Sequence, residues 1–75
     1  MTTHDRISRD PKVMSGKPCI IGTRITVQQI LEDISDGMSF KDMLEAYEHV
    51  SEGDIRAAVA FAADFIAHEG LVAAE

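Results

Sequence analysis

The amino-acid sequence predicts a small, mostly α (α+β) fold, in which an N-terminal two-stranded β element is followed by a three-helix unit with a helix-turn-helix. One observation behind this prediction is the stretch from Ser15 to Val27, which contains two of the five glycines and one of the two prolines. It separates a polar, turn-rich beginning from a helix-like remainder. The other observation is a helix-start pattern that recurs three times from Ile25 onward. At 75 residues, the chain is expected to form a single domain over residues 1–75.

The first 26 residues consist of short extended segments and turns. Residues 6–9 alternate polar and apolar side chains, which is typical of a short edge strand. Asp10 as N-cap and Pro11 as first helical residue predict a single helical turn that Gly16 ends. Over residues 17–25 we expect a strand, a tight turn at Gly22 and a short return strand that leads into the first helix cap.

Three six-residue segments share one helix-start pattern: apolar, Thr or Ser, two variable residues, Gln or Asp, apolar. The hydroxyl residue is the expected N-cap, the Gln or Asp bonds back to it, and the apolar pair forms a hydrophobic staple. Because Asp is a less usual partner than Gln, the second and third boxes are expected to be weaker in detail. The segments are Ile25-Thr26-Val27-Gln28-Gln29-Ile30, Met38-Ser39-Phe40-Lys41-Asp42-Met43 and Val50-Ser51-Glu52-Gly53-Asp54-Ile55.

Apolar residues at helical spacing follow each of these starts. We expect a first helix that Gly37 ends, a short second helix that stops near Tyr47, and a third from about Glu52 to His68. Residues 71–75 are expected to fray. The second and third helices, with a turn of about four residues between them, form the predicted helix-turn-helix, and the three helices together are similar to homeodomain-like folds.

The net charge of −6 is unevenly distributed. Residues 1–26 contain five cations and two acids, a charge of +3, whereas residues 27–75 contain two cations and eleven acids, a charge of −9. The domain therefore divides into a basic β/turn module, residues 1–26, and an acidic three-helix unit, residues 27–75. Contact with a polyanion is expected from the basic module.

Several classes of protein do not fit this sequence. No apolar run approaches the roughly 18 residues of a membrane span, and no signal peptide is expected, so we predict a cytoplasmic protein without membrane contact. The single cysteine, Cys19, cannot form an internal disulfide. His4, His49 and His68 lack a metal-ligand spacing and are expected to be solvated. With no catalytic acid pair, phosphate loop or nucleophile elbow, we expect no enzyme activity, cofactor or metal.

Five cations are candidate DNA-binding residues: Arg6, Arg9, Lys17, Arg24 and Arg56. Lys17 and Arg24 stand beside glycines that allow close approach of a phosphate, which arginine can bind bidentately. The alternative for these two is an ion pair with an acid of the three-helix unit. Arg56 lies near acids at the start of the predicted recognition helix, so we expect the basic module to make any DNA contact.

Two surfaces are candidates for protein contacts. The third helix continues into a wide apolar end, of which Phe61, Phe65 and Leu71 are the predicted partner-binding residues. The alternative is that these residues only widen the core stripe. The unpaired edges of the two short strands favour pairing with a second copy, which predicts a homodimer through the N-terminal strands.

The sequence resembles a family of small bacterial proteins, domain of unknown function 433, often described as VapB-type antitoxin-like. The resemblance covers about residues 7–65 and rests on two runs. The first is a Pro-x-Val-Met-x-Gly-Lys-Pro-x-Ile-x-Gly-Thr-Arg-Ile pattern, matched by Pro11, Val13, Met14, Gly16, Lys17, Pro18, Ile20, Gly22, Thr23, Arg24 and Ile25. The second is matched by Gly37, Met38, Ser39, Ile55, Arg56, Ala57, Ala58 and Phe61.

This resemblance implies an antitoxin-like function. Such proteins are often encoded beside PIN-like ribonuclease toxins and are taken to neutralise the toxin and to bind their own operator DNA. The expectation is therefore a dimer that binds a PIN-like toxin, with operator DNA as a second ligand. The alternatives are a free-standing DNA-binding transcriptional regulator, against which the acidic recognition helix counts, and a structural dimerisation or adaptor domain.

Overall fold

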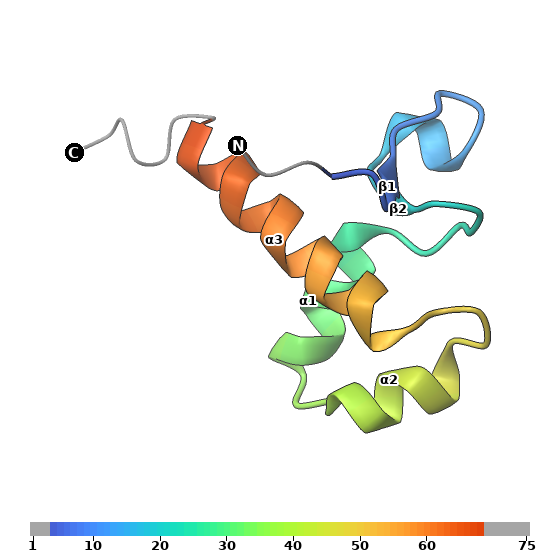
Figure 1. Ribbon diagram of the computed structural model, residues 1–75, viewed down its shortest axis with the longest axis vertical. Coiled ribbons are helices and arrows are strands. Elements are labelled where there is room, and N and C mark those ends of the chain that lie inside the picture. Colours follow the sequence, from blue (N-terminus) through green and yellow to red (C-terminus); the bar gives the residue numbers. More distant parts are fainter. Residues whose placement is uncertain (1–3, 69–75) are drawn as a thin grey trace.

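The computed structural model describes residues 4–68 as a two-stranded β element followed by three helices (Figure 1). The elements are strand β1 (Ile7–Ser8), 3-10 helix η1 (Met14–Gly16), strand β2 (Cys19–Ile20) and helices α1 (Val27–Ser35), α2 (Phe40–Ala46) and α3 (Glu52–His68). The predicted mostly α fold with an N-terminal β element is confirmed. The predicted fraying of residues 71–75 lies outside the described residues. No helix within residues 4–68 is long and apolar enough to cross a membrane.

The β element pairs β1 with β2 in antiparallel register, with Ile7 opposite Ile20 and Ser8 opposite Cys19. The turn after β2 depends on Gly22, whose φ of 77° lies in the left-handed region that glycine adopts without steric cost. The expected return after the turn is present but shorter than a strand: it makes a single antiparallel bridge, between Cys19 and Thr26. It is short because Thr26 already serves as the N-cap of α1.

The predicted helical turn after Asp10 is also wrong. The Asp10 carboxylate accepts a hydrogen bond from the N–H of Lys12 (2.9 Å), and its carbonyl accepts one from the N–H of Val13 (2.8 Å). These bonds form a turn in place of a helix, because an aspartate side chain can satisfy the backbone two residues ahead. The 3-10 helix begins only at Met14, where φ is 49°, and Ser15 also has a positive φ, of 59°.

Helix α1 is capped by Thr26, whose Oγ1 accepts a hydrogen bond from the N–H of Gln29 (2.9 Å). The Gln29 side chain does not bond back to the cap; its Nε2 donates to Oδ1 of Asp33 (3.0 Å). The box with the usual Gln partner is therefore only half formed, because a buried carboxylate one turn later competes for the amide.

The two boxes that use aspartate are complete. In α2 the Ser39 Oγ accepts from the N–H of Asp42 (3.1 Å), and the Asp42 carboxylate accepts from the N–H of Ser39 (3.4 Å). In α3 the bonds between Ser51 and Asp54 measure 3.2 and 3.0 Å. The expectation that these boxes would be the weaker ones is wrong, whereas the three helix starts themselves are confirmed.

Helix α3 is the element around which the others pack, since it contacts α1, α2 and both strands. In Figure 1 it runs diagonally between the β element and α2, with α1 behind it. The order and lengths of α2, the connection of residues 47–51 and α3 match the predicted helix-turn-helix. The buried core consists of Ile20, Val27, Ile30, Met43, Val50, Ile55 and Ala58.

Candidate functional site

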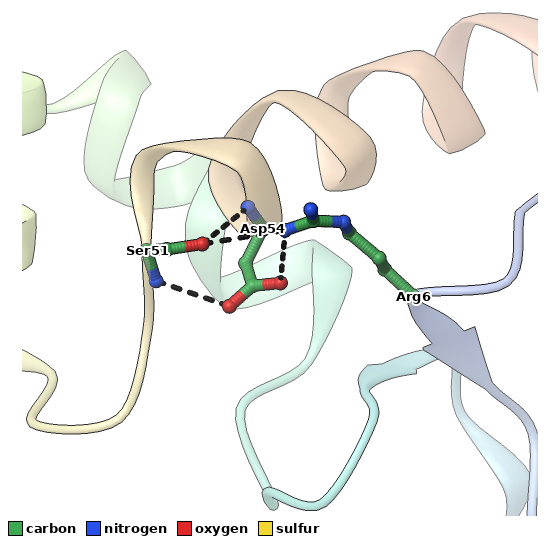
Figure 2. Close-up of polar contacts among 3 residues, drawn as sticks. All are labelled: Arg6, Ser51 and Asp54. Carbon is green, nitrogen blue, oxygen red and sulfur yellow. Dashed lines mark hydrogen bonds and ion pairs between the residues drawn. The ribbon is translucent and has the colours of Figure 1, made fainter.

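Arg6 joins the basic module to the start of α3. Its Nη1 donates to Oδ1 of Asp54 (3.0 Å) and to Oγ of Ser51 (3.3 Å), as Figure 2 shows. The guanidinium lies against Gly53, where an added Cβ would come within 2.6 Å of Nη1. The ion pair that the sequence suggested for Lys17 or Arg24 is thus made by Arg6, which was predicted to bind DNA.

The carboxylate of Asp54 is the acceptor at the centre of this contact. The backbone N–H of Ser51 lowers the pKa of Asp54, and Arg6 lowers it further, while burial acts in the opposite direction. The side chain of Asp54 is 16 % exposed, against 52 % for Arg6. One aspartate therefore caps α3 and, at the same time, binds the basic module to it.

Arg56 is engaged by neighbouring side chains on the acidic unit. Its Nη2 and Nε lie 2.9 and 3.1 Å from Oε2 of Glu52, one turn earlier on α3. Its guanidinium carbon lies 5.7 Å from the ring centroid of Phe40, a cation–π distance. Arg56, the cation near the start of the predicted recognition helix, is therefore paired with an acid beside it.

Arg9 lies over the aromatic side chains of α3. Its guanidinium carbon is 5.9 Å from the ring centroid of Phe61 and 6.0 Å from that of Phe65, and the two rings stack at 6.2 Å. His4 approaches Phe61 edge-on at 5.3 Å, and its Nε2 lies 2.8 Å from Oδ2 of Asp64. The expectation that His4 is merely solvated is wrong, because α3 supplies it with both an aromatic neighbour and a carboxylate.

A groove of about 530 Å³ lies between α1, α3 and the basic module, and we call it the α1–α3 groove. Two of the three predicted partner-binding residues, Phe61 and Phe65, line it. Phe65 and Ile66 are 43 % and 46 % exposed, which is high for large apolar side chains. The complete lining is Arg9, Lys17, Pro18, Thr26, Val27, Gln28, Leu31, Glu32, Ser35, Phe61, Ala62, Phe65 and Ile66. The third predicted residue, Leu71, lies outside the described residues.

Lys17 and Arg24 lie in different places. Lys17 lines the α1–α3 groove, whereas Arg24 lines a second hollow of about 520 Å³ beside Asp10 and the Gly22 turn. Among residues 4–68, neither side chain makes an ion pair with an acid within 4.0 Å. The structure therefore brings Arg9 and Lys17 to one groove and places Arg6, Arg24 and Arg56 elsewhere.

A polar cluster around one buried carboxylate connects α1 with the end of α2. Asp33 is 7 % exposed and accepts hydrogen bonds from the hydroxyl of Tyr47 and from Nε2 of Gln29. Bonding to this carboxylate, together with burial, raises the pKa of Tyr47 to about 12. Sequence reasoning missed this cluster. The spacing of Gln29 and Asp33, four residues apart in a predicted helix, was the available signal.

The described part of the chain offers no obvious metal or thiol site. Within residues 4–68, no three His, Cys, Asp or Glu side chains gather as metal ligands. Cys19 is buried in β2, and burial raises the pKa of its thiol, which disfavours the reactive thiolate. The feature that the described residues do form is an apolar groove with charged residues on its walls.

Comparison with known proteins supports the family resemblance and adds no relative with a known role. A family model described as "Protein of unknown function (DUF433)" matches residues 7–62, more than half of the chain. No curated protein and no solved structure matches the chain significantly. The matched segment includes most of the groove lining, whereas Phe65 and Ile66 lie beyond it.

Proposed function

The chain belongs to the DUF433 family of proteins of unknown function, and from this premise we propose that it is an antitoxin-like protein that binds a PIN-like ribonuclease toxin at the α1–α3 groove. It acts by binding and not as an enzyme. The observation that carries the proposal is the groove itself, an apolar surface on a domain of only 75 residues. Concave, mostly apolar surface of this kind is where proteins commonly bind a ligand.

The exposed side chains of α3 favour a protein as the ligand. Phe65 and Ile66 are each nearly half exposed, and full burial of such a side chain contributes about 1.5–3 kcal/mol. A partner that covers both would gain a substantial part of its binding free energy there. Away from the groove, the acidic three-helix unit suits a partner with a basic surface, because opposite potentials speed association.

Operator DNA is a second candidate ligand, and the observation that favours it concerns Lys17 and Arg24. Of the five predicted DNA-binding residues, these two belong to the basic module and have neither an acid partner nor a cation–π contact among residues 4–68. We propose them as the phosphate contacts of a dimer that forms through the N-terminal strands. Electrophoretic shifts with operator DNA should weaken in the double variant Lys17→Ala/Arg24→Ala and persist in Arg56→Ala.

Co-purification tests the proposal. The tagged protein is purified from its native host at low salt, and proteins bound at a fixed ratio are identified by mass spectrometry. We expect a small PIN-like protein with the wild type, and its loss with Ile66→Glu, because a charge in the groove resists burial. Ile34→Glu is the matched control, since Ile34 is 37 % exposed on α1 and does not line the groove.

Three results would contradict the proposal. Recovery of DNA without a PIN-like protein would favour a free-standing regulator. Recovery of neither, from a protein that remains a homodimer, would favour the adaptor alternative. A partner that Ile66→Glu and Ile34→Glu retain equally would place the toxin contact outside the α1–α3 groove.

A further inference from the structure

We infer that the segment bound in the α1–α3 groove is an amphipathic helix of the partner, whose carboxylates face the wall formed by Arg9 and Lys17. This inference rests on the proposed function and names the chemistry of the partner's contact segment. It is carried by the shape of the groove walls and by the cations on one of them.

The walls of the groove favour a helix over an extended peptide. Two walls are helices, with apolar side chains four residues apart: Val27 and Leu31 on α1, Phe61 and Phe65 on α3. Rows of side chains at this spacing form ridges, and a third helix packs its own ridge into the channel between them. An added strand would need unpaired backbone groups, which the interior of a helix does not offer.

The size of the groove is also suited to such a helix. Its volume of about 530 Å³ lies within the range of roughly 300–1,000 Å³ of small-molecule pockets, which is room for a few large side chains and not for a whole helix. Helices that dock into grooves insert a few large apolar side chains at positions i, i+3 or i+4, and i+7. The described walls therefore accept the apolar face of a helix of two or three turns.

The charges on the walls indicate which side of the partner helix carries carboxylates. Arg9 and Lys17 come from the basic module, and neither pairs with an acid among residues 4–68. Lys17 is fixed next to the start of α1, because the carbonyl of Pro18 accepts the N–H of Val27 (2.9 Å). The acid in the lining is Glu32, on α1, which accepts a hydrogen bond from Gln28 (3.2 Å). Carboxylates of the partner are therefore favoured on the module side.

The net charge of the chain favours the opposite preference, so the two effects can be told apart by experiment. At −6 the whole protein favours a basic peptide at long range. A preference for an acidic helix must therefore come from local contacts in the groove, which remain at physiological salt, where the Debye length is about 8 Å.

Two synthetic amphipathic helices provide the test. They share leucines at i, i+4, i+7 and i+11, and differ in carrying glutamates or lysines beside the apolar face. Fluorescence anisotropy at 150 mM salt should show about fivefold tighter binding of the glutamate peptide, from two partly exposed ion pairs. In the double variant Arg9→Glu/Lys17→Glu the preference should reverse.

The matched control changes the same amount of charge away from the groove. Lys12→Glu/Lys41→Glu should keep the preference for the glutamate peptide, because both lysines lie outside the lining. Circular dichroism checks that each variant is folded. The double variant Arg9→Gln/Lys17→Gln removes the two charges without reversing them. In this variant the two peptides should bind equally.

Three outcomes would overturn the inference: equal binding of the two peptides, tighter binding of the lysine peptide by the wild type, or no binding of either at 1 mM. A dimer in sedimentation that Ile66→Glu dissociates would also overturn it, because a second copy would then fill the groove. If the PIN-like protein is still captured and Ile66→Glu abolishes its capture, the proposed function stands and only the helix chemistry is wrong.

Discussion

Gly53 is a residue at which two demands on the chain compete. Glycine is a poor helix former, yet a Cβ here would come within 2.6 Å of the Arg6 guanidinium. Because glycine has no side chain, Arg6 has room to reach Asp54. The position thus exchanges some helix propensity for the contact between the basic module and α3.

A double-mutant cycle measures this exchange. In the Arg6→Ala background, Gly53→Ala should stabilise the protein by about 0.5–1 kcal/mol, because alanine favours the helix. In the wild-type background the gain should be about 0.5 kcal/mol smaller, because the new methyl group displaces the ion pair. Urea unfolding followed by circular dichroism gives both values. Equal gains in the two backgrounds would show that the contact contributes no stability.

The hydroxyl of Tyr47 satisfies a carboxylate that is almost fully buried. Tyr47→Phe should destabilise the protein by about 1–3 kcal/mol at neutral pH, since Asp33 then keeps only Gln29 as a side-chain donor. The double variant with Asp33→Asn should cost less than the sum of the single changes. A cost below 0.5 kcal/mol for Tyr47→Phe would mean that water replaces the hydroxyl.

The pH dependence of this contact follows from the raised pKa of Tyr47. The folded value of about 12 lies above the ordinary value of 10.0. The stability that the contact between Tyr47 and Asp33 adds is therefore fully present below pH 10 and is lost as the pH rises towards 12. The difference in unfolding free energy between wild type and Tyr47→Phe should shrink across this window, and a constant difference would contradict the assignment.

At the scale of the elements, the turn after β2 needs glycine at position 22 for its backbone conformation and not for lack of space. An added Cβ at Gly22 would meet no atom within 4 Å, although φ is 77°. Gly22→Ala should therefore cost about 1–2 kcal/mol from backbone strain alone, and Gly22→Asn less, since asparagine tolerates this region. Thermal unfolding checks the order. Equal costs for the two changes would indicate a packing demand that the structure does not show.

Local signals predicted the helices well and the first turns poorly. A cap, a staple and an apolar stripe act within a few residues, so the starts of α1, α2 and α3 could be found from the sequence. The turn at Asp10 could not, because one aspartate side chain decides between a helix start and a turn. The competition of Asp33 for Gln29 likewise depends on burial, which a local pattern does not reveal.

The candidate site was predictable only in its parts. The sequence selected Phe61 and Phe65 as partner residues and Arg9 and Lys17 as functional cations, but for different functions. That they share a groove depends on contacts between distant segments, such as the pairing of Arg6 with Asp54 across 48 positions. No helical or strand periodicity carries such information, so their common location required the structure.

For the whole molecule, the separation of charge predicts a response to salt. The acidic unit of residues 27–75 carries −9 and the basic module +3, so repulsion within the unit exceeds the attraction between the two. Raising sodium chloride from about 0.01 to 1 M shortens the Debye length from about 30 to 3 Å. The melting temperature should rise by several degrees, with potassium chloride giving the same rise; a fall would show that attraction dominates.

The groove joins side chains from both ends of the described chain, with Arg9 on one wall and Ile66 on another. The walls formed by the basic module and α1 are synthesised before α3, so the groove cannot form until α3 has been made. The groove is therefore complete only when α3 packs against α1 and the basic module. Conversely, a protease that cuts either wall abolishes the site in a single step.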